Sequence, residues 1–119
     1  DAGTSALLPR SIGAARTRAM ALLGEPLGAT EAQDAGLLWK AVAPEDLFAE
    51  AMTVAERLAA GPAQALSLIR RQLDDAWSAS LPATLDCEAE MQARAFASAD
   101  LREGVAAFVE RRPPRFTGA

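Results

Sequence analysis

The sequence predicts a mainly α-helical chain of about six helices and one short strand, and this prediction rests on composition and periodicity. Half of the 119 residues are hydrophobic but only 5% are aromatic, and alanine supplies much of the apolar share. Small side chains of this kind favour closely packed helices over sheets of β-branched residues. The chain has the length of one domain and no long linker, so we expect residues 1–119 to form a single unit.

The first half of the chain contains two predicted helices and the strand. Apolar residues recur with helical spacing from Ile12 to Leu22, and Gly24 is a suitable C-terminal stop. Residues 30–33 have the spacing of a capping box, which opens a short helix that a glycine ends. Residues 37–43 form an apolar run ended by a proline and are the one plausible strand.

The second half contains four predicted helices with clear start and stop signals. Each of them begins near a proline or a carboxylate that suits the first turn of a helix. These residues are Asp46, Pro62, Pro82 and Asp100. The second of these helices carries an apolar stripe expected to be core, at Leu66, Ile69, Leu73 and Trp77. Residues 100–103 form another capping box, and Pro113 and Pro114 end the last helix.

Composition excludes several classes of function. No apolar run approaches the roughly 20 residues that span a bilayer, and a net charge of −4 argues against nucleic acid as a partner. The chain has no histidine, so it cannot build a Ser-His or Cys-His nucleophile or a histidine metal site by itself. Cys87 is the one cysteine and has acidic neighbours, which favours an inert thiol in a reducing cytoplasm. We expect no metal and no redox cofactor.

Asp1 is the candidate catalytic residue. It is followed by small, flexible residues, by hydroxyls that can cap a helix and then by Leu7 and Leu8, a pattern that can hold one acid at the mouth of an apolar pocket. The alternative is that Asp1 only begins a helix. Because the opening looks like the middle of a catalytic loop, we expect the chain to be a piece of a longer protein.

The C-terminal end contains a candidate binding site for an anionic ligand. The last nine residues carry three arginines and no acidic side chain. Phe108 and Arg111 are three residues apart on the predicted last helix and therefore share a face, with Arg115 a turn further on. An aromatic ring beside guanidinium groups can hold an adenine ring that bears phosphates. The alternative is a solvated tail.

Motifs along the whole chain resemble the C-terminal half of the crotonase superfamily, the enoyl-CoA hydratases and isomerases. The short stretches of this chain that match the superfamily are residues 1–3, 7–10, 21–24, 35–39, 61–62, 68–69, 103–108 and 116–118. The resemblance implies the C-terminal helical part of the crotonase α/β spiral fold. In that fold, residues 1–43 would end the catalytic core and residues 44–119 would form a helical trimerisation region.

The resemblance also implies a function. Relatives of this kind act on acyl-CoA thioesters, and two backbone N–H groups stabilise an enolate while a carboxylate moves the proton. Asp1 matches the carboxylate, and Phe108 and Arg111 match the residues that reach the CoA nucleotide. The implied protein is a cytoplasmic trimer or hexamer that isomerises or hydrates thioesters in phenylacetate or fatty-acid breakdown. The rival hypothesis is a non-catalytic helical assembly module, and we expect the isolated chain to be inactive.

Overall fold

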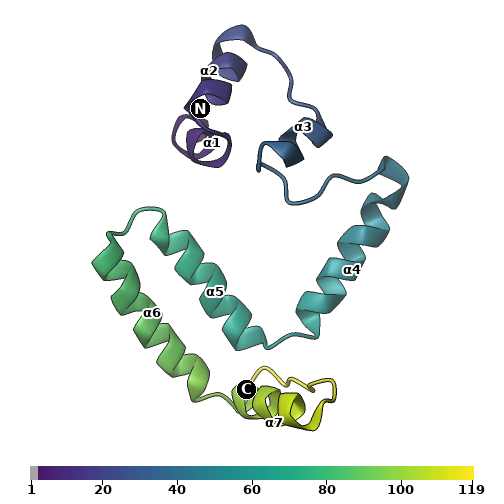
Figure 1. Cartoon of the computed structure of the whole chain (residues 1–119), viewed down its shortest axis with the longest axis vertical. Helices are drawn as coiled ribbons and strands as arrows, with labels where there is room; N and C mark the ends of the chain where they lie inside the picture. Colours follow the sequence, from purple (N-terminus) through teal and green to yellow (C-terminus); the bar gives the residue numbers. More distant parts are fainter. Residues whose placement is uncertain (1–2) are drawn as a thin grey trace. The chain divides into compact units, whose positions relative to one another are not determined.

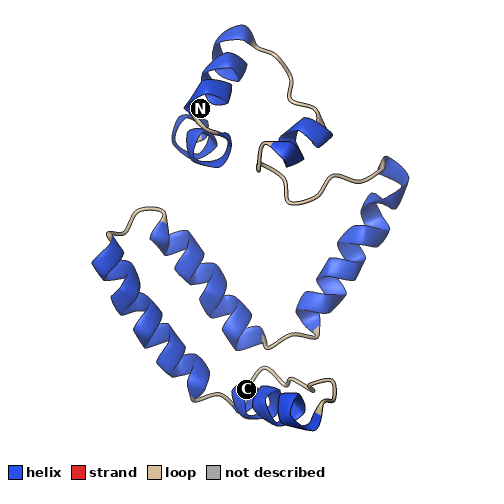
Figure 2. Cartoon of the chain, viewed as in Figure 1, coloured by secondary structure: helices blue, strands red, loops and turns tan. Residues whose placement is uncertain are grey.

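The computed structural model describes residues 3–119, and in this range it contains seven α-helices, one short 3-10 helix and no strand (Figure 2). The mainly helical class predicted from the sequence is therefore confirmed. The chain divides into two compact units, Asp1–Leu47 and Phe48–Ala119, each of which is described by itself.

The N-terminal unit contains α1 (Thr4–Ile12), α2 (Ala14–Leu23) and α3 (Ala29–Asp34), of which α1 and α2 pack against each other (Figure 1). The first two are separated at Gly13, whose φ of 83° and ψ of 156° suit glycine far better than any other residue. The predicted helix with a stop at Gly24 is confirmed as α2, whose C-cap is Gly24, but its predicted start at Ile12 was wrong because the break at Gly13 separates Ile12 from it. Ile12 instead ends α1, where it is buried.

The strand predicted at residues 37–43 was also wrong. The backbone N–H groups of Leu37 and Leu38 both donate to the carbonyl of Ala32, which closes the C-terminal end of α3. The N–H of Ala41 donates to the side-chain oxygen of Gln33. A strand needs a neighbouring strand to satisfy its backbone groups, and no other segment of residues 3–119 supplies one.

The predicted capping box at residues 30–33 does not form either. The helix α3 begins at Ala29, and Gly28 is its N-cap without a side-chain hydrogen bond. Thr30 therefore lies within the first turn instead of capping it. A 3-10 turn, η1 (Pro44–Asp46), follows the loop after α3.

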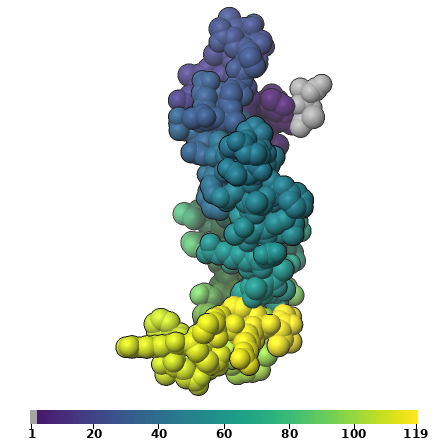
Figure 3. All heavy atoms as spheres, turned by 90° about the vertical axis from the view of Figure 1, so that its right-hand side faces the viewer, coloured from purple at the N-terminus to yellow at the C-terminus, as the bar shows by residue number. Residues whose placement is uncertain are grey.

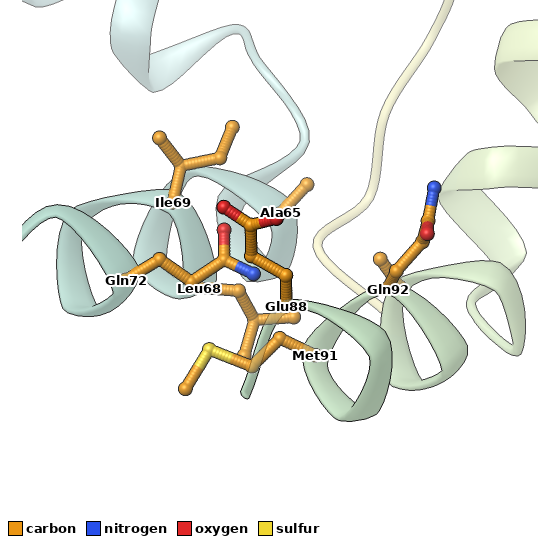
Figure 4. A pocket seen from close by; sticks show the side chains of 8 residues that line it. Ala65, Leu68, Ile69, Gln72, Glu88, Met91 and Gln92 are labelled. Atoms are coloured by element: carbon orange, nitrogen blue, oxygen red, sulfur yellow. The ribbon is translucent and has the colours of Figure 1, made fainter. Parts of the chain in front are cut away.

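The C-terminal unit contains α4 (Leu47–Ala59, of which Leu47 falls in the first unit), α5 (Ala63–Ala76), α6 (Leu81–Phe96) and α7 (Ala99–Glu110). The helices α5 and α6 lie side by side (Figure 1). Leu68 from α5 and the buried Met91 from α6 line a shallow hollow of about 290 Å³ between them (Figure 4).

The apolar stripe of α5 is not a core face within this chain. Ile69, Leu73 and Trp77 are 50%, 63% and 45% exposed, and of these three only Ile69 is among the residues that line the hollow between α5 and α6. The helix α4 also presents an exposed apolar side chain, because Phe48 is 77% exposed. Several helices of this chain therefore present apolar faces that their own unit does not cover.

Candidate functional site

The candidate site is formed by α7 and by residues 111–119, which we call the strap. The strap leaves the C-terminal end of α7 and returns along it, so that the two lie together at the end of the C-terminal unit (Figures 1 and 3). Its last residue reaches the first turn of α7, where the Ala119 carbonyl accepts a hydrogen bond of 2.9 Å from the N–H of Ala99. The strap is thus held at both ends of the helix.

Asp100 binds the far end of the strap. This carboxylate is only 3% exposed, and its two oxygens accept backbone N–H bonds from Thr117 at 2.7 Å and from Gly118 at 2.9 Å. The sequence predicted that Asp100 caps α7, and this was wrong. Ser98 is the N-cap and accepts from the N–H of Leu101 at 3.1 Å, which leaves Asp100 available to the strap.

Glu103 binds the near end of the strap. Its two oxygens accept from Nη1 and Nη2 of Arg112 at 2.6 and 3.0 Å, and Oε1 also accepts from the backbone N–H of Arg115 at 2.7 Å. The bond from Arg112, followed by that from Arg115, lowers the pKa of Glu103 to about 2. A paired fork of this kind fixes both the position and the orientation of a guanidinium group. Arg112 also donates from Nε to Glu110 at 2.6 Å.

Arg111 is the first residue of the strap and has an unusual conformation. With φ 55° and ψ 41° it is the one non-glycine residue at positive φ in the part of the chain that the structure describes. Helices often end in this left-handed conformation, but the residue is usually glycine. The turn is closed by the N–H of Arg112, which donates to the carbonyl of Ala107 at 3.0 Å.

The two binding residues predicted from the sequence lie next to this turn. Phe108 is 85% exposed on the last turn of α7, and its carbonyl accepts from the N–H of Arg111 at 3.2 Å. Because α7 ends at Glu110, Arg111 is not part of the helix, and the argument that helical spacing places both on one face does not hold. Within residues 3–119, no hydrogen bond or ion pair engages the guanidinium of Arg111.

Phe108 borders an apolar hollow of about 360 Å³. Its walls come from the start of α5, the end of α6, α7 and the strap, and include Phe96, Val105 and Phe116. A hollow with these walls can accept a flat or apolar group. Sequence reasoning missed Phe116 and the two strap-binding carboxylates, although three arginines following Asp100 and Glu103 were a usable signal of charge pairing.

Asp1, the predicted catalytic residue, lies outside the described residues. The described segment begins at Gly3, which has φ 85° and precedes α1 as its N-cap. Leu7 is 52% exposed and Leu8 is half-buried. The described residues hold no group of three or more His, Cys, Asp or Glu side chains that could bind a metal ion. No helix in the same range is long and apolar enough to span a membrane.

Comparison with known proteins identifies the class of this helical chain. A model of the enoyl-CoA hydratase/isomerase family matches residues 1–119. A crystal structure of an enoyl-CoA hydratase subunit from Geobacillus kaustophilus superposes with a TM-score of 0.93 and 37% identity, covering 100% of this chain and 46% of that one. The chain belongs to the enoyl-CoA hydratase/isomerase family.

Two curated relatives are similar over nearly the whole chain. A protein named probable enoyl-CoA hydratase, from Rhodobacter capsulatus, is 45% identical over 118 residues, which are 99% of this chain and 46% of that protein. The 1,2-epoxyphenylacetyl-CoA isomerase of Escherichia coli is 42% identical over 118 residues, which are 99% of this chain and 45% of the isomerase. The chain therefore spans less than half the length of the curated relatives it matches.

Proposed function

We propose that this chain contributes the helical part of a CoA-thioester isomerase or hydratase. The proposal is carried by one observation, the match of the whole chain to a family whose members include a hydratase and an acyl-CoA isomerase. Within the described residues, the exposed Phe108 and the unengaged guanidinium of Arg111 support it, because CoA carries an adenine ring and several phosphates.

Asp1 is the proposed acid/base of this reaction. A carboxylate near an apolar wall can take a proton from a thioester's activated carbon and return it at another position, while backbone N–H groups stabilise the enolate oxygen. Those N–H groups would come from outside residues 1–119. We therefore expect no turnover by this chain alone, since each such donor contributes about 3–4 kcal/mol in comparable acyl chemistry.

The remaining features of the proposal follow from the same family. The acyl group would come from phenylacetate or fatty-acid breakdown, and the whole protein would be a cytoplasmic trimer or hexamer. No metal or redox cofactor is required, because acyl-CoA is the substrate and proton transfer at an enolate needs only a positioned carboxylate and hydrogen-bond donors.

A second candidate function is assembly without catalysis. The exposed apolar faces of α4 and α5, which include Phe48 and Leu73, favour it for the chain taken alone. Assembly by itself requires neither a carboxylate before Gly3 nor an arginine held unpaired at the end of α7. These two features favour an enzyme for the whole protein.

The test is the Asp1→Asn variant of the whole protein, assayed with enoyl-CoA and epoxyacyl-CoA thioesters. We expect kcat to fall by about two to four orders of magnitude, the usual contribution of a positioned acid/base, while acyl-CoA affinity stays nearly unchanged. Wild-type turnover by Asp1→Asn on every thioester that the unmodified protein converts would rule out the catalytic role. Asp34→Asn, which changes an exposed carboxylate at the end of α3, is the matched control.

A further inference from the structure

Glu103 does more than tie the strap to α7. It lies nine residues before Arg112 in the sequence, yet it receives a two-pronged bond from that guanidinium and a third bond from the backbone of Arg115. For Arg112 to reach back along the helix, the chain must reverse its direction immediately after Glu110. Arg111 makes this reversal, and its left-handed conformation is the one that a reversal at a helix end requires.

The choice of residue at this turn is informative. A non-glycine residue in the left-handed region is strained, and such strain persists only where surrounding contacts impose it. Here the contacts are the Arg112–Glu103 ion pair and the hydrogen bond from the backbone N–H of Arg112 to the carbonyl of Ala107. Glycine would fit the turn without strain. An arginine at this position therefore indicates that its side chain has a role other than stabilising the fold.

Arg111 and Arg112 differ in whether their guanidinium groups are paired within the described residues. Arg112 is occupied by Glu103 and Glu110, with 37% of its side chain exposed. Because Glu103 is itself paired through both oxygens, its negative charge is compensated at the place where an anion would approach. A hollow of about 350 Å³ lined by Glu103, Arg112 and Arg115 opens beside this pair. Unpaired, the same carboxylate would repel a phosphate.

We propose that Glu103 is a positioning residue for the nucleotide end of the substrate. By fixing Arg112 and the backbone of Arg115, it holds Arg111 in the conformation that presents its guanidinium to a phosphate group. This inference rests on the proposed function, because it takes the phosphates to be those of an acyl-CoA.

The experiment compares two thioesters of the same acyl group on the whole protein. One is the acyl-CoA, and the other is the N-acetylcysteamine thioester, which has the reacting carbonyl but no nucleotide. For Glu103→Gln we expect KM for the acyl-CoA to rise about tenfold with kcat unchanged, since Gln cannot form the charged fork. Both constants for the N-acetylcysteamine thioester should stay at wild-type values.

Two further variants separate positioning from general stability. Glu110→Gln removes the other carboxylate that pairs with Arg112 but leaves the bonds of Glu103 to Arg112 and Arg115 intact, so its KM should change less than twofold. Arg112→Lys keeps the charge but loses the fork, and should raise KM for acyl-CoA as Glu103→Gln does. The double variant should be no worse than either single one, because both changes break the same pair.

Three results would overturn the proposal. One is an unchanged KM for acyl-CoA in both Glu103→Gln and Arg112→Lys. Another is an equal loss on both thioesters, which would mean a general effect on the fold. The third is an equal effect of Glu110→Gln. If the wild-type protein neither converts nor binds either thioester, the proposed function fails and this inference fails with it.

Discussion

The helices α7 and α4 have similar lengths, of 12 and 13 residues, but only α7 is bound by a strap. The strap binds polar groups of α7 from within the chain, through Asp100, Glu103 and the Ala119 carbonyl, although Phe108 and Val109 of α7 are 85% and 74% exposed. On α4, Leu47, Phe48 and Leu58 are between 54% and 77% exposed. The first region is held by polar bonds to specific atoms, and the second has an apolar face that remains to be covered.

The difference indicates what each region is for. Polar bonds are directional and hold one geometry, which a ligand-binding end requires. An apolar face has little directional preference and gains free energy from any well-fitted apolar surface. We interpret α7 and its strap as a positioning element and α4 as an association surface. The following predictions test this distinction.

The largest expected effect is at Asp100. Replacing it with alanine removes the acceptor of two backbone N–H groups, of Thr117 and Gly118, which should cost about 3 kcal/mol, and leaves the backbone bonds to the Ala119 carbonyl in place. Amide hydrogen exchange at Thr117 and Gly118 in the whole protein should therefore accelerate by about a hundredfold.

The control for this variant is Asp86→Ala, which removes an exposed carboxylate on α6. It should change stability by no more than about 0.5 kcal/mol and leave exchange in the strap unaltered. Equal exchange rates at Thr117 and Gly118 in both variants would show that Asp100 does not hold the strap.

A smaller effect is expected at the apolar face of α4. The chain of 119 residues, purified alone, should self-associate because this face is uncovered. Phe48→Ser should weaken that association by about 1.5–3 kcal/mol, the value of burying one large apolar side chain. Light scattering over a range of concentrations measures both effects, with Glu56→Gln on the same helix as the control. A stable monomer at every concentration would contradict the interpretation of α4.

The smallest expected effect is the pH dependence of the stability that Glu103 contributes to the folded protein. Its pKa of about 2 in the folded protein lies below the ordinary value of 4.5, so its contribution to stability is complete above pH 4.5. That contribution is lost as the pH falls from 4.5 towards 2. The difference in denaturation midpoint between wild type and Glu103→Gln should therefore shrink over this window. A difference that stays constant from pH 6 to pH 2 would contradict the pairing.

The sequence predicted helices well where local signals decide them. Glycine and proline stops before α5 and after α7, and the apolar spacing of the last four helices, correspond closely to observed elements. The strand at residues 37–43 was mispredicted because a strand is defined by its neighbour, and an apolar run carries no information about whether one is present.

The site was harder to predict because it depends on long-range pairs. Asp100 and Glu103 have the spacing of a capping box, and the same spacing allows them to bind a segment nine to eighteen residues further along. The local sequence pattern does not show whether these carboxylates cap α7 or bind the strap, because Ser98 can also act as the N-cap. The left-handed turn at Arg111 was likewise hidden, because glycine is the usual marker of such a turn.

The most direct test of the account uses Arg111→Gly in the whole protein. Glycine relieves the left-handed strain, so thermal unfolding should show stability maintained or raised by about 1 kcal/mol. The same variant loses the guanidinium, so titration with acyl-CoA should show affinity weakened by about 1–3 kcal/mol. Stability and binding should thus change in opposite directions. Lower stability with unchanged acyl-CoA affinity would show that Arg111 serves the fold and not the ligand.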